Sequence, residues 1–356
     1  MSIDGGGIVS GMRFRAAFIA AMVVIGTIRF AEAKMAGVRD FAVFAPARNA
    51  VFHATVWYPA GGNGKAVLVG DNAIFIGTKG LRNAPIAAGR FPLIIISHGG
   101  FRAAPNIASW LASALAGKGY IAAVVIPPAV PPGPPKQSVL NELWLRPADL
   151  SAILSAVEKQ PTFFGKIDTN EIGAVGFFLG GYAVLELAGA RVDAKVFAQS
   201  CEGGQIGPDC AWFAQGGVDL RRVDAARLER SNLDWRFKAA VVIDPELTSA
   251  LTRRSLQAVS IPIHVVNLGQ QDAIPAAFDA SRLASEIPGA TYATIPKAGP
   301  FSSFPECKPN ALSFLKGEGE GALLCSDSSG RSRPDIHSAL ASMIEADLEQ
   351  SFSTKK

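Results

Sequence analysis

The chain has 356 residues, of which 49% are hydrophobic and 18% are charged, and its formal net charge is +4. This composition supplies a large apolar core and excludes a disordered chain, and the length is compatible with a single α/β domain. The sequence has no run of five or more Lys and Arg residues, so a nucleic acid partner is not expected.

The N-terminus has the order of segments that is typical of a secretory signal peptide. A basic stretch over residues 12–15 precedes an apolar run over residues 16–28 and a small-residue motif at residues 31–33. The apolar run is short for a membrane span, and Arg29 beside the motif leaves an uncleaved anchor as the alternative. We expect translation to start at Met12, cleavage to follow the motif, and the mature protein to be periplasmic or secreted. No membrane contact beyond this segment is expected.

The four cysteines fit an exported chain. Cys201 and Cys210 are nine residues apart, and Cys307 and Cys325 are eighteen apart. In an oxidising compartment this spacing indicates two local disulfides, with free buried thiols as the alternative. A zinc site would require C-x-x-C pairs or nearby histidines, and the sequence has neither, so no metal is expected.

Strand and helix patterns alternate along the chain after residue 40. Alternating apolar residues predict an antiparallel hairpin over residues 40–59, and continuous apolar runs predict strands that are buried on both faces. The strands expected after this hairpin cover residues 91–97, 120–126, 171–175, 195–199, 238–243, 263–268 and 291–295. The expected helices cover residues 107–118, 147–160, 181–190 and 334–352, with Pro147 in the first turn of the second helix.

This alternation predicts an α/β fold with a mostly parallel central sheet and helices on both faces. The proline-rich residues 127–135 are expected to form a rigid, extended loop, because proline continues neither a helix nor a strand ladder. Residues 200–237 contain two of the cysteines and several arginines, and we expect an insertion or cap there. The sequence therefore predicts an N-terminal extension and signal peptide over residues 1–33 and one domain over residues 34–356.

One strand and the helix after it are joined by a glycine-rich turn. The turn reads Gly176-Phe177-Phe178-Leu179-Gly180, which has the spacing of the G-x-S-x-G nucleophile elbow. The glycines are needed because the central residue occupies a strained turn with closely packed neighbouring backbone. Phe178 occupies the central position, so the sequence predicts the backbone of such an elbow without its nucleophile.

Several other short motifs occur before and after this elbow along the chain. They are Val56-Trp57-Tyr58-Pro59, Ser97-His98-Gly99-Gly100, Arg146-Pro147-Ala148-Asp149, Gly180-Gly181-Tyr182, the turn with Gly269, Asp272 and Pro275, Ala298-Gly299, and the pair Arg333 and His337. Over residues 40–350 this series resembles the dienelactone hydrolase-like family, which is similar to the platelet-activating-factor acetylhydrolases. The resemblance implies an α/β-hydrolase fold and a carboxylic-ester hydrolase ancestry, and this chemistry needs no cofactor.

The resemblance also implies roles for individual residues. His98, Gly99 and Gly100 match the loop that offers a backbone N–H to the oxyanion, with a simple strand-to-helix turn as the alternative. Asp272 matches the acid that orients the catalytic histidine, with an ordinary turn residue as the alternative. Pro300 occupies the position of that histidine, and proline can neither take nor give a proton.

The chain has four histidines, and none follows Asp272 in a loop that could face the elbow. They are His53, His98, His264 and His337. Ser302 and Ser303 lie beside position 300, but the sequence indicates no histidine that could serve either of them as a base. Loss of triad members costs several orders of magnitude in rate, so hydrolysis is expected to be impaired.

Three functional hypotheses follow. The first is an exported hydrolase-family protein that is catalytically impaired and binds a small apolar or ester-like ligand. In that case Phe177, Phe178, Leu179, Phe301 and Phe304 would line the pocket together with the glycine loop, although they could equally fill the former cavity as core. The second is an active serine-type ester hydrolase that uses unrecognised residues. The third is a secreted scaffold whose partner docks on residues 200–237. The sequence indicates no oligomeric state.

Overall fold

The structure is a computed structural model that describes residues 1–2, 5–7, 35–101, 104–126, 133–163, 165–202, 209–276, 278–315, 321–327 and 330–353. By its internal contacts the chain divides into two units, Met1–Ala33 and Lys34–Lys356. The predicted signal segment and its cleavage motif lie outside the described residues, and so does most of the proline-rich loop. Among the described residues, no helix is both long and apolar enough to span a membrane. The second unit contains the fold described below.

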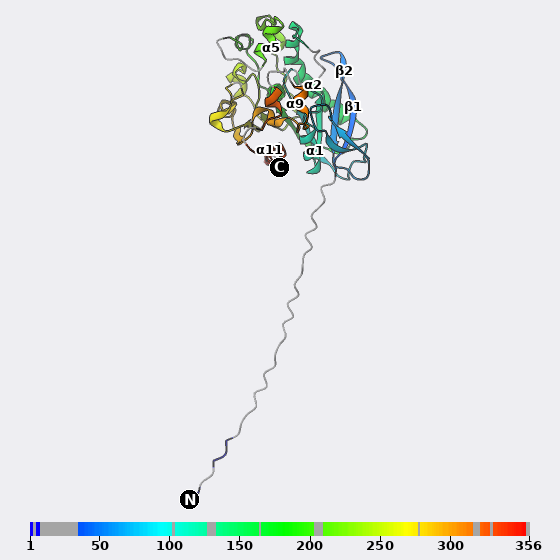
Figure 1. Ribbon diagram of the computed structural model, residues 1–356, viewed down its shortest axis with the longest axis vertical. Helices are drawn as coiled ribbons and strands as arrows, with labels where there is room; N and C mark the ends of the chain where they lie inside the picture. Colours follow the sequence, from blue (N-terminus) through cyan, green and yellow to red (C-terminus); the bar gives the residue numbers. More distant parts are fainter. Residues whose placement is uncertain are drawn as a thin grey trace. The chain divides into compact units, whose positions relative to one another are not determined.

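Ten strands form one sheet in the order β10-β9-β8-β7-β5-β6-β2-β1-β4-β3. The paired strands β1 and β2 lie side by side in Figure 1. The strands are β1 Gly37–Ala45, β2 Ala50–Tyr58, β3 Lys65–Val69, β4 Thr78–Arg82, β5 Phe91–Ser97, β6 Ile121–Ile126, β7 Ile167–Phe177, β8 Ala239–Ile243, β9 Ile263–Leu268 and β10 Thr291–Ile295. From β10 through β6 the neighbouring strands are parallel, whereas β2 pairs antiparallel with both β1 and β6. The predicted α/β class with a mostly parallel central sheet is confirmed.

Helices lie on both faces of this sheet. The α-helices are α1 Ser109–Gly117, α2 Glu142–Lys159, α3 Leu179–Leu187, α4 Ala194–Ala198, α5 Cys210–Gln215, α6 Ala225–Leu228, α7 Arg253–Leu256, α8 Ser281–Glu286, α9 Ala311–Phe314, α10 Gly321–Leu324 and α11 Arg333–Ser353. Short 3-10 helices are η1 Gln137–Asn141, η2 Leu220–Arg222, η3 Thr248–Ala250, η4 Gln271–Ala273 and η5 Pro300–Ser303. Residues of α2 and α3 share one apolar core, and residues of α1 and α11 share the other.

Strand β5 shows how one apolar run supplies both cores. Successive side chains of a strand point to opposite faces. Leu93 and Ile95 therefore join the core under α2 and α3, whereas Ile94 and Ile96 join the core under α1 and α11. Each of these side chains is fully buried, and burial of one such side chain contributes about 1.5–3 kcal/mol. The expected double-faced burial of this strand is thus explained by the two helical layers.

Two sequence predictions are wrong in detail. Where a strand was predicted over residues 195–199, residues 194–198 form helix α4, because the Asp193 carboxylate accepts hydrogen bonds from the N–H groups of Lys195 and Val196 in its first turn. Pro147 lies inside α2 and not in its first turn. Helix α2 starts earlier because Arg48 forms ion pairs with both Glu142 and Asp149, which lie two turns apart on one face.

Candidate active site

The nucleophile-elbow backbone is present around Phe178. Strand β7 ends one residue before it and α3 begins one residue after it, and Phe178 has φ 55° and ψ −124°. A Cβ atom on Gly176 would lie 2.4 Å from the carbonyl oxygen of Gly180, and one on Gly180 would lie 2.3 Å from that of Ser97. Both glycines are therefore required by the close approach of backbone, as the motif predicts.

The Phe178 side chain lies inside an aromatic cluster and is 4% exposed. Its ring centroid lies 5.7 Å from that of His98, 5.6 Å from that of Phe278 and 5.9 Å from that of Phe304. His98 also stacks on Phe177 at 4.6 Å and meets Phe304 edge-on at 4.9 Å. We call these five residues the aromatic cluster. Where a hydrolase would hold a reactive hydroxyl, this chain packs rings with the offset and edge-to-face geometry of a protein core.

His98 lies next to a serine that the sequence did not connect to it. Its Nε2 atom is 3.2 Å from both the hydroxyl and the carbonyl oxygen of Ser303. The expectation that no histidine lies beside Ser303 is therefore wrong, because the two residues are 205 positions apart and meet only through the fold. Burial lowers the pKa of His98 to about 3, so the imidazole is neutral at physiological pH. Within the described residues its Nδ1 atom has no hydrogen-bond partner.

A buried arginine holds the loop after His98 through hydrogen bonds to its backbone. Arg146 donates through one Nη atom to the carbonyl of Gly99 at 3.1 Å and through the other to that of Gly100 at 2.6 Å. The cavity between His98, Arg146 and Asp149 measures only about 10 Å³. That volume is at the lower limit for one water molecule. The oxyanion role of this loop stays a prediction, and the described residues leave little room beside it for a substrate.

Described residues of the 200–237 segment pack on the end of the same loop. Trp212 and Phe213 of α5 pack against Phe101, with ring centroids 6.3 and 5.2 Å from it. The disulfide Cys201–Cys210 closes the segment at the start of α5. The second expected disulfide, Cys307–Cys325, is also present. The described part of this segment therefore contacts the chain just after the His98 loop, and a role as a cap stays a prediction.

Two predicted positions of the triad do not form a catalytic pair. Asp272 lies on the exposed 3-10 turn η4, and among the described residues its carboxylate has no hydrogen-bond partner. Pro300 begins η5, which places Phe301 in contact with Phe304 at 5.7 Å. The assignment of Asp272 as a retained acid stays a prediction.

A buried carboxylate that the sequence did not single out lies closer to the elbow. Asp244 follows strand β8 directly and is 1% exposed, and the preceding Ile243 accepts a hydrogen bond from the N–H of Phe178. One Asp244 oxygen accepts hydrogen bonds from the Asn267 amide at 2.6 Å and from the N–H of Leu268 at 3.0 Å. The other oxygen has no partner among the described residues, and burial raises the pKa of Asp244 to about 7. The sequence pattern that could have identified Asp244 is an aspartate directly after a buried apolar strand, at the edge of the sheet where the parallel strands end.

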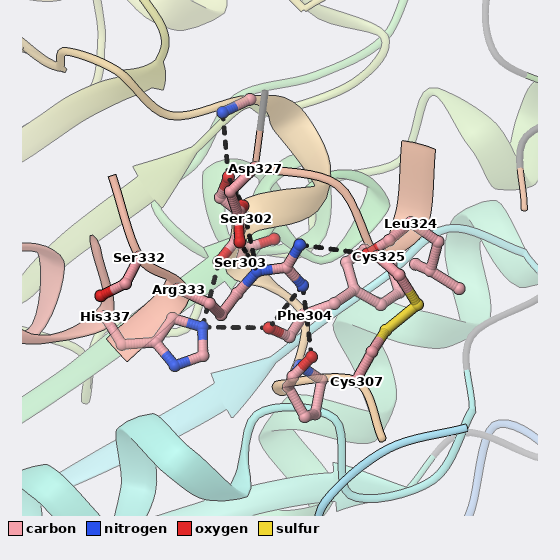
Figure 2. A network of polar contacts seen from close by, with 12 residues as sticks. Ser302, Ser303, Phe304, Cys307, Leu324, Cys325, Asp327, Ser332, Arg333 and His337 are labelled. Carbon is pink, nitrogen blue, oxygen red and sulfur yellow. Dashed lines mark hydrogen bonds and ion pairs between the residues drawn. A yellow bond between two sulfur atoms is a disulfide. The ribbon is translucent and has the colours of Figure 1, made fainter. Parts of the chain in front are cut away.

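A second polar network ties η5 to the start of α11 (Figure 2). Arg333 pairs with Asp327 at 2.9 Å and donates to the carbonyl oxygens of Phe304 and Pro305. The hydroxyl of Ser302 donates to the same aspartate at 2.7 Å, and Nε2 of His337 lies 3.0 Å from the carbonyl oxygen of Ser302. Arg333 and His337 therefore both hold the η5 backbone in place.

Comparison with known proteins gives a match in structure. The fold is similar to the solved structure of a ferulic acid esterase from Streptomyces cinnamoneus, with a TM-score of 0.57 over 89% of each chain and a sequence identity of 14%. No family model matches the chain, and no curated protein matches it significantly in sequence. The likeness shows that the chain shares the α/β fold of that protein.

Proposed function

We propose that this chain is an exported protein of the dienelactone hydrolase-like family that no longer hydrolyses esters. The observation that carries the proposal is the buried Phe178 ring at the centre of the elbow, packed against His98, Phe278 and Phe304. A phenyl ring offers no nucleophile, and it fills the space that the reacting carbonyl of a substrate would need. The motif series and the esterase-like fold support the ancestry.

The electrostatics around the elbow also support the loss of catalysis. A general base works best when its pKa lies near the operating pH, and burial holds the pKa of His98 near 3. A catalytic histidine also needs an acid on its second nitrogen, and Nδ1 of His98 has no partner among the described residues. His98 is therefore suited to packing and to fixing η5, and not to proton transfer.

An active hydrolase that uses Ser303 and His98 is the second candidate. The 3.2 Å separation between the Ser303 hydroxyl and Nε2 of His98 favours it, because this is the geometry of a nucleophile beside its base. Against it, Ser303 is fully buried, its hydroxyl donates to the carbonyl of Pro300, and its histidine has the low pKa described above. We therefore rank it below the non-hydrolytic function.

Covalent labelling separates the two candidates. The purified protein is treated with a fluorescent fluorophosphonate and, separately, assayed with p-nitrophenyl acetate. We expect no label and no turnover above the buffer rate, both in the wild type and in Ser303→Ala. Labelling of the wild type that disappears in Ser303→Ala would show that the second candidate is correct and the proposal wrong.

Restoration of the missing groups tests the ancestry. The double variant Phe178→Ser with Pro300→His returns a hydroxyl to the strained elbow position and a base to the loop after β10. We expect this variant to gain fluorophosphonate labelling, because the elbow backbone and both glycines are in place. Phe178→Ser alone is the matched control and should stay unlabelled. Absence of labelling in a folded double variant would contradict the proposed ancestry of the site.

The two disulfides and the predicted signal segment support the export part of the proposal. Expression of the full chain in a bacterium with a periplasm, followed by fractionation, tests it. We expect the processed protein in the periplasmic fraction, with thiol alkylation shifting its mass only after reduction. A cytoplasmic protein with four freely alkylated thiols would show that the chain is not exported.

A further inference from the structure

A groove of about 480 Å³ lies between α1 and α11, and its lining shares no residue with the aromatic cluster. The start of β4 and the loop at residues 305–306 close its ends. Its volume falls in the range of small-molecule sites, which is about 300–1,000 Å³. The elbow side has a cavity of only about 10 Å³. A small ligand therefore has room in this groove, whereas the cavity beside His98 is too small for one.

One wall of the groove is a fixed pair of aromatic rings. The rings of Trp110 and His337 are stacked, with centroids 3.7 Å apart and planes 4° from parallel. Each ring is held by a backbone carbonyl. The indole N–H of Trp110 donates to the carbonyl of Ser303. Nε2 of His337 lies 3.0 Å from the carbonyl oxygen of Phe304 (Figure 2). Burial and the neighbouring Arg333 charge lower the pKa of His337 to about 4, so this wall is uncharged at neutral pH.

The charges that line the groove leave one carboxylate in excess. Lys118 of α1 pairs with Glu345 of α11 at 3.1 Å, which balances these two groups. The Glu306 carboxylate, on the loop at residues 305–306, also lines the groove. It makes no hydrogen bond or ion pair within the part of the chain that the structure describes. With one ammonium and two carboxylates, the charged side chains of the lining carry a net negative charge, which disfavours an anion and favours a cation.

The loop that presents Glu306 is held rigidly. The N–H of Ile76 donates to the carbonyl of Glu306 at 2.8 Å, and Arg333 donates to the carbonyl of Pro305 at 3.2 Å. The disulfide Cys307–Cys325 anchors the next residue (Figure 2). A preformed position loses less side-chain and loop entropy when a ligand binds.

We propose that this groove binds a small organic cation, an alkyl- or arylammonium compound. Glu306 supplies the counter-charge, and the indole of Trp110 supplies an aromatic wall, a combination that favours ammonium groups. The hydroxyls of Thr78, Ser338 and Ser342 also line the groove and can accept or donate hydrogen bonds to a polar substituent. The inference does not depend on whether the elbow hydrolyses esters, because the two sites share no residue.

The test uses benzyltrimethylammonium as the probe and measures its binding to the full chain by ligand-observed NMR and isothermal titration calorimetry. Its uncharged carbon isostere, neopentylbenzene, and the anion benzenesulfonate are the comparison probes. We expect saturable binding of the cation, at least tenfold weaker binding of the isostere, and no binding of the anion. Equal binding of the cation and its isostere, binding of the anion, or no saturable binding of the cation would overturn the proposal.

Three variants, each of which removes one charged group, test which charge binds the cation. Glu306→Gln should raise the Kd of the cation at least fivefold, because it removes the uncompensated carboxylate. Lys118→Gln should lower the Kd, because it releases Glu345 from its ion pair. Glu349→Gln changes the net charge by the same amount as Glu306→Gln, but at an exposed position of α11 outside the groove. It should leave the Kd unchanged. Equal effects of all three, or no effect of Glu306→Gln, would show that the groove does not hold the cation.

Discussion

Position 178 combines a backbone conformation suited to a small reactive residue with a large apolar side chain. A non-glycine residue at φ 55° carries backbone strain of the order of 1–3 kcal/mol. In this chain the ring contacts of Phe178 offset that strain, because its side chain is almost fully buried among three other rings. The same conformation that exposes a nucleophile in an esterase here directs a ring into the core.

Removal of the Phe178 side chain should therefore be costly. In Phe178→Ala the backbone strain stays, while the ring contacts are lost and a cavity opens. We expect the free energy of unfolding, measured by urea denaturation, to fall by about 3–4 kcal/mol, as is usual for a buried Phe→Ala change. Phe44→Ala, at a side chain that is 56% exposed, is the control and should change stability by less than about 0.5 kcal/mol. A loss below about 1 kcal/mol at position 178 would mean that the ring is not packed as described.

Contacts between residues close together in the sequence could be predicted. Contacts between residues that are far apart in the sequence could not. The elbow could be predicted because Gly176 and Gly180 lie within five positions of each other and their requirement is steric. The contact between His98 and Ser303 could not, because β5 and η5 approach only once the sheet is assembled. Asp244 was missed for a related reason, since its burial depends on Asn267 on the neighbouring strand.

At the scale of elements, apolar runs predicted the central strands well and short polar-flanked segments poorly. Strands β5, β9 and β10 have the predicted bounds. In β5 a continuous apolar run between turn signals leaves few alternatives to a buried strand. The segment at residues 195–199 has a similar apolar content, but the cap from Asp193 makes it a helix. Strands β3 and β4 were not predicted, because both are short and only partly buried, and β3 is the edge strand of the sheet.

Helix α3, which follows the elbow, contains a carboxyl group that makes it sensitive to pH. Glu186 is fully buried and is bonded to the hydroxyl of Tyr182 at 2.9 Å and to the amide of Asn232 at 2.7 Å. Burial raises the pKa of Glu186 to about 8 from a model-compound value of 4.5. Because the folded state holds this proton more tightly than the unfolded state, the associated stability is full below about pH 4.5 and is lost as the pH rises through about 8.

The variant Glu186→Gln tests this dependence. Glutamine keeps the shape of the protonated side chain but cannot ionise. We expect the Tm of the wild type to fall between pH 5 and pH 9, and the Tm of Glu186→Gln to fall less over the same range. Differential scanning calorimetry at pH 5, 7 and 9 measures both, with Glu349→Gln as the exposed control that should follow the wild type. Parallel profiles for the wild type and Glu186→Gln would contradict a protonated buried Glu186.

At the scale of the whole molecule, the two disulfides brace two different segments that contact the site region. Cys201–Cys210 closes the segment that packs on the loop after His98, and Cys307–Cys325 closes the segment that presents Glu306 and Asp327. The sheet itself contains no disulfide within the described residues, and its two apolar cores do not depend on one. Reduction should therefore loosen the covering segments first and leave the sheet folded.

The double variant Cys307→Ser with Cys325→Ser provides the strictest test of this division. Loop closure of this length restricts the unfolded chain, so its loss should cost about 3 kcal/mol. We expect a lower Tm with an unchanged far-UV circular dichroism spectrum at 25 °C, together with weaker binding of benzyltrimethylammonium, because the loop of Glu306 loses its anchor. Cys201→Ser with Cys210→Ser is the matched control, which should lower the Tm by a similar amount and leave cation binding intact. Equal loss of binding in both double variants would place the effect in global unfolding and would refute a local role for the Cys307–Cys325 bridge at the groove.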